Sequence, residues 1–302
     1  MTTLRRVVVL GFAGMLAALP ACTTNAATGR SQLNLLSRSE EIAMGEGAMP
    51  EMIQEYGGAV TDPTVTGYVA EVGGKLTQQT ESNYAELPWE FTVLDSDVLN
   101  AFALPGGKVF ISRGLAEKLN NEAELAFVLG HECGHVTAQH VDERMSRQYA
   151  LAFGGALVGA VAQRSEAEWA QLGGQLLISG AGVYALKFDR NQESEADSLG
   201  IRYMAKAGWN PIGAQQAMQV LADESKNASR PPEFLSTHPN PETRLVRIGQ
   251  ILESEHPDAL TSPDRNTNPT RYQNKMLSRL AALDARRRRS RRRVRAGGHA
   301  SV

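Results

Sequence analysis

Apolar positions recur at intervals of three and four residues in several segments of this 302-residue chain. Residues 121–140 show this spacing without a proline inside, and Asn121 is placed to cap the first turn. Such a period predicts amphipathic helices, each with one apolar face turned toward a core. We expect further helices over residues 39–49, 63–80, 189–206, 211–224 and 242–252.

The pattern changes to that of strands ahead of the helix at residues 121–140. Residues 89–95 alternate between apolar and polar side chains, and residues 98–103 can continue in an extended form. A turn signal, PGG at residues 105–107, precedes residues 108–112, which are predicted to form the returning strand. We therefore expect an α+β fold that is mostly helical and contains a small antiparallel sheet.

Two further apolar stretches, residues 149–162 and 172–186, are rich in glycine and alanine. Helices of this length reach about 21–23 Å, which is short of the roughly 30 Å of a bilayer core. They predict a buried helical hairpin or, alternatively, a mobile lid or a surface that contacts a membrane or a membrane-protein client.

The first residues have the pattern of an export signal. Two arginines precede an apolar run at residues 7–19, which is too short to span a bilayer. The run ends in LPAC at residues 19–22, which resembles a bacterial lipobox. We expect residues 1–21 to be a lipoprotein signal peptide and Cys22 to carry membrane-anchoring acyl chains. An ordinary cleaved signal with a chance cysteine is the alternative. By resemblance to bacterial lipoproteins, Thr23 favours the outer membrane.

Composition divides the rest of the chain. Residues 22–38 are expected to be a tether, residues 39–256 the folded domain, and residues 257–302 a polar, then Arg-rich, disordered tail. From Arg271 onward ten Arg and one Lys stand against Asp284 alone, whereas the whole chain has a formal net charge of −2, so the body is acidic. The tail could bind anionic lipid or lipopolysaccharide phosphates, or fold onto the body. No nucleic-acid partner is expected for an exported protein.

Residues 131–135 read HECGH, an HExxH motif on the helix predicted at residues 121–140. His131 and His135 are four residues apart on one helix face, so both imidazoles can reach one Zn²⁺ ion. Glu132 is rotated by about 100° from His131, which lets it act as general base on a water at the metal. The same carboxyl group can then protonate the leaving amine. We therefore predict one zinc ion per chain and a catalytic role for Glu132.

Catalytic zinc takes three protein ligands and keeps one position open, so a second helix is expected to supply the third ligand. Glu193 and Asp197 share a helix face. Glu193 is predicted to bind zinc, and Asp197 to accept a hydrogen bond from a ligand histidine. Glu195 lies off that face and is expected to be solvated, and His140 is expected to be structural or solvated. A purely structural zinc site fits poorly, because Cys133 points away from the ligand face.

Four features carry a resemblance to a known family. They are NAF followed by PGG at residues 100–107, HECGH at 131–135, the spacing of Glu193 and Asp197, and STHP at 236–239 leading to Arg244. Together they resemble the zinc metallopeptidase family of HtpX and the CaaX prenyl proteases, in particular its periplasmic BepA-like and LoiP-like members. The resemblance implies a zincin-like core of the gluzincin type, with the metallopeptidase domain at residues 39–256.

The resemblance also implies how a substrate is held. A peptide would lie extended along an edge strand, here residues 107–112, by strand addition. Asn100, Ala101, Gly107 and Val109 would then contact the bound peptide.

His238 stands in a proline-rich loop, and the resemblance implies two roles for it. It would occupy the fourth zinc position and hold the enzyme inactive, or it would donate to the oxyanion of the tetrahedral intermediate. A loop histidine without a role is the remaining alternative. Arg244 is expected to orient this loop or to stabilise charge near the metal.

Together these expectations describe a periplasm-facing, lipid-anchored zinc endopeptidase of the bacterial envelope, on the outer membrane, that serves quality control. Its partners would be unfolded or misassembled envelope polypeptides. The alternative is a lipoprotein that acts mainly as a chaperone or assembly factor for outer-membrane proteins, with proteolysis secondary. Function that survives Glu132→Gln in cells would indicate this alternative.

Overall fold

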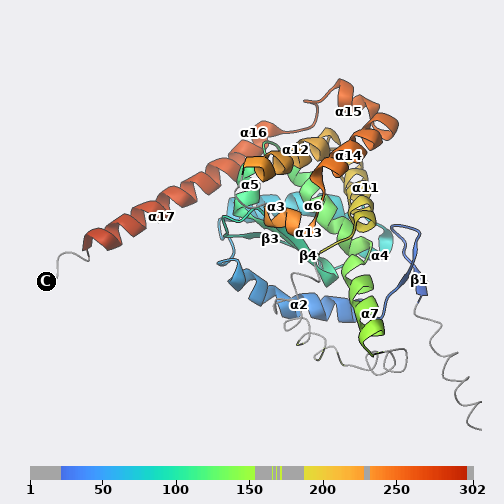
Figure 1. Cartoon of the computed structure of the whole chain (residues 1–302). Helices are drawn as coiled ribbons and strands as arrows, with labels where there is room; N and C mark the ends of the chain where they lie inside the picture. Colours follow the sequence, from blue (N-terminus) through green and yellow to red (C-terminus); the bar gives the residue numbers. More distant parts are fainter. Residues whose placement is uncertain are drawn as a thin grey trace, which may run out of the picture.

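The computed structural model describes residues 22–153, 187–227 and 232–297, with the single positions 165, 168 and 171. The predicted signal peptide and most of the two Gly- and Ala-rich stretches lie outside these residues. Figure 1 shows a mostly helical body around a small sheet, with α17 projecting from it. The strands are β1 (Cys22–Thr24), β2 (Ser31–Leu33), β3 (Glu90–Leu94), β4 (Ala101–Leu104) and β5 (Lys108–Ser112). The helices of the body are α2 (Arg38–Glu55), α3 (Pro63–Thr77), α4 (Ser82–Ala85), α5 (Arg113–Lys118), α6 (Glu122–Thr137), α7 (His140–Phe153), α11 (Arg190–Lys206), α12 (Ile212–Asn227), α13 (Glu233–Thr237) and α14 (Pro241–Glu255).

The main sheet has the order β3-β5-β4. β4 pairs antiparallel with β5, but β3 pairs parallel with β5, so the expectation of a wholly antiparallel sheet is wrong for β3. The segment at residues 95–100 carries the chain across to the far side of β5, which places β5 in the centre. Residues 107–112 are therefore not the edge strand, and the expected peptide-binding edge has to be reassigned. Within the described residues β4 pairs with β5 alone.

α6 is the central helix, and all sixteen of its residues are buried. It packs on β4 on one side and against α11 and α12 on the other. Asn121 caps it as expected, accepting a hydrogen bond from the backbone N–H of Glu124 at 3.0 Å. Because this helix is enclosed on all sides, every side chain that it carries must be apolar or have a partner in the fold.

The expected tether at residues 22–38 is folded against the domain. β1 and β2 form an antiparallel pair, and Asn25 and Gln32 are buried. Their side-chain amides donate to the carbonyl oxygens of Thr137 at 2.9 Å and Ala138 at 3.1 Å. Those carbonyls end α6 and need outside donors, so this polar segment serves to cap a helix.

The tail expected to be disordered continues the fold through α15 (Pro257–Thr261), α16 (Pro269–Tyr272), the π-helical η3 (Gln273–Leu277) and α17 (Ser278–Gly297). Tyr272, Met276 and Leu280 have no exposed surface and join the main core. The Arg-rich composition concealed these apolar positions, which recur at intervals of four. The folded domain therefore extends beyond residue 256.

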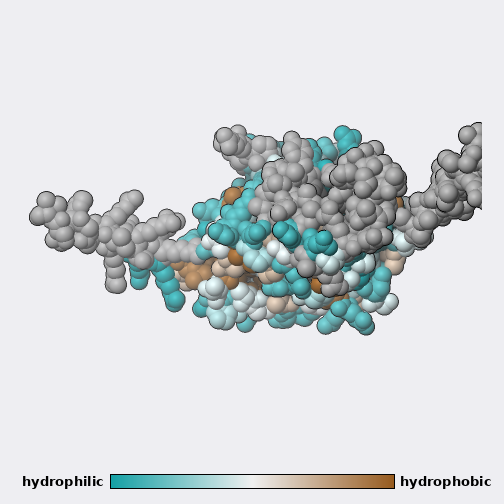
Figure 2. Space-filling model, turned by 90° about the horizontal axis from the view of Figure 1, so that it is seen from below, coloured by the Kyte–Doolittle hydropathy of each residue, from teal (hydrophilic) through white to brown (hydrophobic). Residues whose placement is uncertain are grey.

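The surface seen from below in Figure 2 is mostly hydrophilic where it is described. Apolar residues gather on its left side, where α17 leaves the body. None of the described helices combines the length and apolar character that a membrane crossing needs.

Candidate metal centre and active site

His131 and His135 project from α6 toward one point, as their spacing predicted. Their Nε2 atoms lie 3.0 Å apart, and each residue is 1% exposed. Glu132 between them is completely buried.

Close contact between α6 and α11 brings the third expected ligand, Glu193, to this point. Gly134 of the motif lies so near α11 that a Cβ atom there would stand 3.0 Å from the carbonyl oxygen of Ala196. A Cβ atom on Gly200 would approach the backbone nitrogen of His131 to 2.8 Å. Glycine at both places lets the backbones touch. Glu193, in the first turn of α11, then reaches 3.6 Å from Nε2 of both His131 and His135.

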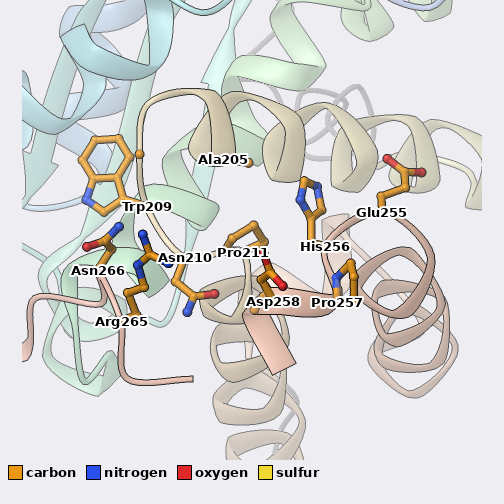
Figure 3. A pocket seen from close by; sticks show the side chains of 12 residues that line it. Ala205, Trp209, Asn210, Pro211, Glu255, His256, Pro257, Asp258, Arg265 and Asn266 are labelled. Carbon is orange, nitrogen blue, oxygen red and sulfur yellow. The ribbon is translucent and has the colours of Figure 1, made fainter. Parts of the chain in front are cut away.

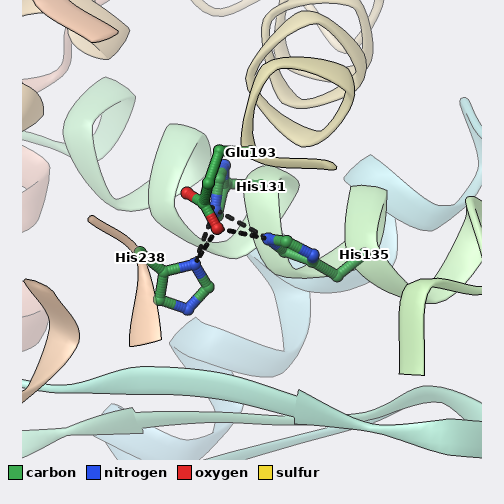
Figure 4. Close-up of side chains that lie close together, drawn as sticks. All are labelled: His131, His135, Glu193 and His238. Atoms are coloured by element: carbon green, nitrogen blue, oxygen red, sulfur yellow. Dashed lines mark hydrogen bonds and ion pairs between the residues drawn. The ribbon is translucent and has the colours of Figure 1, made fainter. Parts of the chain in front are cut away.

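His238 completes a four-residue cluster, which Figure 4 shows. It follows α13, and its backbone N–H donates to the carbonyl of Phe234, whose ring stacks on the imidazole at 4.3 Å between centroids. Nδ1 of His238 lies 2.9 Å from Oε1 of Glu193 and 3.2 Å from Nε2 of His131. The loop thus presents one ring nitrogen to the cluster.

The spacing of the four donor atoms fits a tetrahedral zinc ion. Ligand atoms about 2.0–2.1 Å from a tetrahedral ion stand roughly 3.4 Å from one another. Five contacts within the cluster, which involve both oxygens of Glu193, run from 2.9 to 3.6 Å, and one ligand atom from each of the four residues lies within 4.8 Å of the others. Three imidazoles and one carboxylate are also the nitrogen and oxygen ligands that zinc accepts. The cluster can therefore hold one zinc ion, with His131, His135, Glu193 and His238 as its ligands.

Glu132 lies beside this cluster without being part of it. Its Oε1 is 3.7 Å from Nε2 of His238, and neither of its oxygens accepts a hydrogen bond from any described residue. Burial raises the pKa of Glu132 to about 7. Burial and the charge of Arg244 lower the pKa of His131 to about 4, which keeps that ring neutral and able to bind a metal. A carboxyl group with a pKa near neutrality suits proton transfer in both directions.

Asp197 and Arg244 support His131 from behind. Oδ1 of Asp197 lies 3.0 Å from Nδ1 of His131, which is the contact that the sequence predicted. Arg244 donates to both oxygens of Asp197, at 2.6 and 2.9 Å, and its Nη1 lies 2.9 Å from Oε2 of Glu193. Arg244 therefore anchors the two carboxylates of α11 and the first turns of α14 together.

His135 has a different support, which sequence reasoning missed. Nδ1 of His140 lies 2.9 Å from Nδ1 of His135, and Nε2 of His140 lies 2.9 Å from Oε2 of Glu195. Arg30 in turn pairs with Glu195. His140 is completely buried, which fits the structural alternative of its expectation, because the turn between α6 and α7 brings it back over the ligand helix. The Glu195 side chain is 25% exposed and bound to His140 and Arg30, rather than free in solvent as expected. The one signal in the sequence was a histidine five residues beyond the HExxH motif.

The expected peptide-binding residues divide into two groups. Asn100 and Ala101 stand at the start of β4, the outer strand on the α6 side. Asn100 is buried, and its amide donates to Tyr56 and to Glu233, each at 2.9 Å. Gly107 and Val109 belong to the turn and to the central strand β5, so they do not line an edge.

A separate pocket of about 290 Å³ lies where α11 ends and α15 begins (Figure 3). Trp209, Asn210, His256 and Arg265 are among its lining residues, and none of the four clustered residues lines it.

Comparison with known proteins gives one family and several relatives. Residues 63–252 match peptidase family M48. The beta-barrel assembly-enhancing protease of Yersinia pestis is 34% identical over 220 residues, which cover 72% of this chain and 45% of that protein. A putative protease of the same name from Vibrio cholerae is 30% identical, with 83% and 51% covered. The mitochondrial metalloendopeptidase OMA1 of Schizosaccharomyces pombe is 32% identical, with 74% and 65% covered. The chain spans about half the length of the first two relatives.

Proposed function

We propose that this chain, which belongs to peptidase family M48, is a zinc-dependent endopeptidase that cleaves unfolded polypeptides. The observation that carries the proposal is the cluster of four potential zinc ligands with the buried Glu132 beside it, whose oxygens accept no hydrogen bond from any described residue. A buried carboxylate without a partner is costly unless it has a task, and here the task is proton transfer.

The roles of the residues follow from their positions. Zinc, when bound, supplies a Lewis acid that polarises the scissile carbonyl. Glu132 takes the proton of the attacking water and returns it to the leaving amine, as its pKa of about 7 allows. Asp197 holds the Nδ1 proton of His131, so that Nε2 keeps its lone pair for the metal.

The resting enzyme is proposed to be latent through His238. With His238 the cluster has four protein ligands, and a closed set of four is typical of zinc sites without catalytic function. Removal of His238 opens one position. His238→Ala should therefore raise the rate of proteolysis, whereas an unchanged or lower rate would favour the oxyanion role of His238.

A substrate is proposed to add as a strand beside β4, beginning at Asn100 and Ala101. This replaces residues 107–112 as the edge, since β5 is central. β4 packs on the helix that carries the HExxH motif, so a peptide along β4 would pass the metal. The hydrogen bond from Asn100 to Glu233 connects the start of β4 to α13, which His238 directly follows.

The setting is proposed to be the bacterial envelope. From the sequence we propose that residues 1–21 are a signal peptide, that Cys22 is lipidated and that the protein lies at the outer membrane. We also propose that the Arg-rich segment binds anionic lipid. The relatives named beta-barrel assembly-enhancing protease support misassembled envelope proteins as clients. The same name supports the second candidate, an assembly factor whose proteolysis is secondary.

The test is metal content together with casein cleavage, for the native full chain and Glu132→Gln in parallel. About one zinc per chain in both is expected, with a low rate of cleavage in the native protein that Glu132→Gln abolishes and His238→Ala raises. Absence of zinc from the native protein would overturn the proposal. A cellular function that persists in Glu132→Gln would favour the assembly factor.

A further inference from the structure

The two ring nitrogens of His135 face different partners. Nε2 belongs to the four-residue cluster and lies 3.0 Å from Nε2 of His131. Nδ1 points the other way and lies 2.9 Å from Nδ1 of His140. One ring nitrogen can therefore bind a metal only if the other carries the proton, and His140 is the group that receives that proton's hydrogen bond.

His140 is itself held from its far side. The residue is completely buried, and its Nε2 lies 2.9 Å from Oε2 of Glu195. Glu195 accepts hydrogen bonds from Arg30, at 3.0 Å from Nε and 3.3 Å from Nη2. Arg30 comes from the turn between β1 and β2 and also binds Glu143 through both terminal nitrogens at 2.7 Å.

Only one arrangement of protons satisfies this series of contacts when Nε2 of His135 binds a metal. His135 then donates from Nδ1 to Nδ1 of His140, and neutral His140 donates from Nε2 to Glu195. Glu195 accepts from both His140 and Arg30 as a carboxylate. Each group donates or accepts as its chemistry allows, so the chain of contacts selects one tautomer of both rings.

We propose that His140, Glu195 and Arg30 form a positioning chain that fixes the tautomer and ring orientation of the ligand His135. The inference rests on the proposed zinc function and extends it to residues outside the HExxH motif and Glu193. It links the N-terminal segment to the metal site, because Arg30 lies in the turn between β1 and β2, and Asn25 of that turn and Gln32 of β2 cap the C-terminal end of α6.

The test measures zinc affinity of the full chain by competition with a chromophoric chelator. His140→Leu removes the acceptor for Nδ1 of His135, and zinc affinity should fall about 10–100-fold. His140→Gln keeps an acceptor oxygen and a donor amide, so it should restore most of the affinity. The visible spectrum of the cobalt-substituted protein should change in His140→Leu and return in His140→Gln, which a merely structural role would not cause.

A matched pair of variants separates metal positioning from stability. Glu195 and Glu143 both pair with Arg30, but of the two only Glu195 lies within hydrogen-bond distance of a ring nitrogen of His140. Glu195→Ala should lower zinc affinity about tenfold, whereas Glu143→Ala should leave it unchanged even where the metal-free protein is less stable. Native affinity in His140→Leu and Glu195→Ala, or equal losses in both glutamate variants, would overturn the positioning chain. These outcomes leave the endopeptidase proposal standing, which fails instead if the native chain binds no zinc.

Discussion

Each histidine of the HExxH motif is held by a carboxylate that pairs with an arginine, but the two carboxylate–arginine pairs differ in how deeply they are buried. Behind His131 stands the pair of Asp197 and Arg244, whose side chains are 0% and 5% exposed. Behind His135 the series runs through His140 to the pair of Glu195 and Arg30, whose side chains are 25% and 32% exposed. Both series end in a carboxylate paired with a guanidinium group.

The difference follows from the geometry of α11. Asp197 and Glu195 are two residues apart, so they point to different sides of the helix. Asp197 reaches a ligand directly, whereas Glu195 needs a second imidazole to bridge the gap. We call Asp197 and Arg244 the inner pair, and Glu195 and Arg30 the outer pair. From their difference in burial we expect the inner pair to affect both protein stability and metal binding, and the outer pair to affect mainly metal binding.

The largest effect is expected from breaking the inner pair. Asp197→Ala leaves Arg244 buried without its main partner, which should lower the free energy of unfolding of the metal-free protein by about 3–5 kcal/mol. Glu195→Ala should cost about 1 kcal/mol, because water can reach the vacated position. Urea unfolding of both variants measures the contrast. Equal losses would show that depth does not separate the two pairs.

Asp142 is another buried carboxylate, and it sharpens the comparison because no arginine among the described residues forms an ion pair with it. Its Oδ1 accepts from Ser146 at 2.9 Å, but Oδ2 has no hydrogen-bond partner among the described residues. Burial, with the nearby charge of Glu41, raises the pKa of Asp142 to about 8. By contrast, although burial acts in the opposite direction, Arg244 holds the pKa of Asp197 well below its usual range.

The raised pKa of Asp142 predicts how the free energy of unfolding depends on pH. The folded protein binds a proton at Asp142 that the unfolded chain releases near pH 4, so stability should fall as pH rises from about 4 to 8. The contribution is at most about 1.4 kcal/mol per pH unit. Asp142→Asn should flatten this fall, since the amide resembles the protonated acid. An unchanged slope of unfolding free energy against pH in Asp142→Asn would contradict this assignment.

The inner support could be predicted from the sequence, and the outer one could not. Periodicity places Glu193 and Asp197 on one helix face, and the need of a catalytic zinc for a third ligand predicts that this face lies opposite the HExxH motif, whereas the contact of Arg244 with Asp197 was not predicted. A straight continuation of α6 would place His140 off the ligand face. The structure ends α6 at Thr137, and Gln139 has a left-handed backbone, so the chain turns before His140.

Long-range pairing explains the other differences between expectation and structure. Strand order cannot be obtained from alternation, because the same pattern suits a central and an edge strand. Arg30 lies 165 positions from Glu195 along the sequence. Because such distant partners cannot be read from local sequence, the polar segment at residues 22–38 has the pattern of a tether. His131 and His135 could be predicted to lie together because their spacing is local to one helix.

The smallest effect is expected from Arg30→Lys, which tests where the outer chain ends. The planar guanidinium binds Glu143 and Glu195 at once, and a single ammonium group keeps the charge but cannot hold both carboxylates in that geometry. We expect the free energy of unfolding to change by less than about 1 kcal/mol, because the pair is partly exposed. Zinc affinity should fall, but less than in Glu195→Ala, since Glu195 would still accept from His140. Chelator competition and urea unfolding of the same preparation measure both quantities. Unchanged zinc affinity in Arg30→Lys would show that the positioning chain ends at Glu195. Arg30 would then serve only to hold the N-terminal segment against the domain.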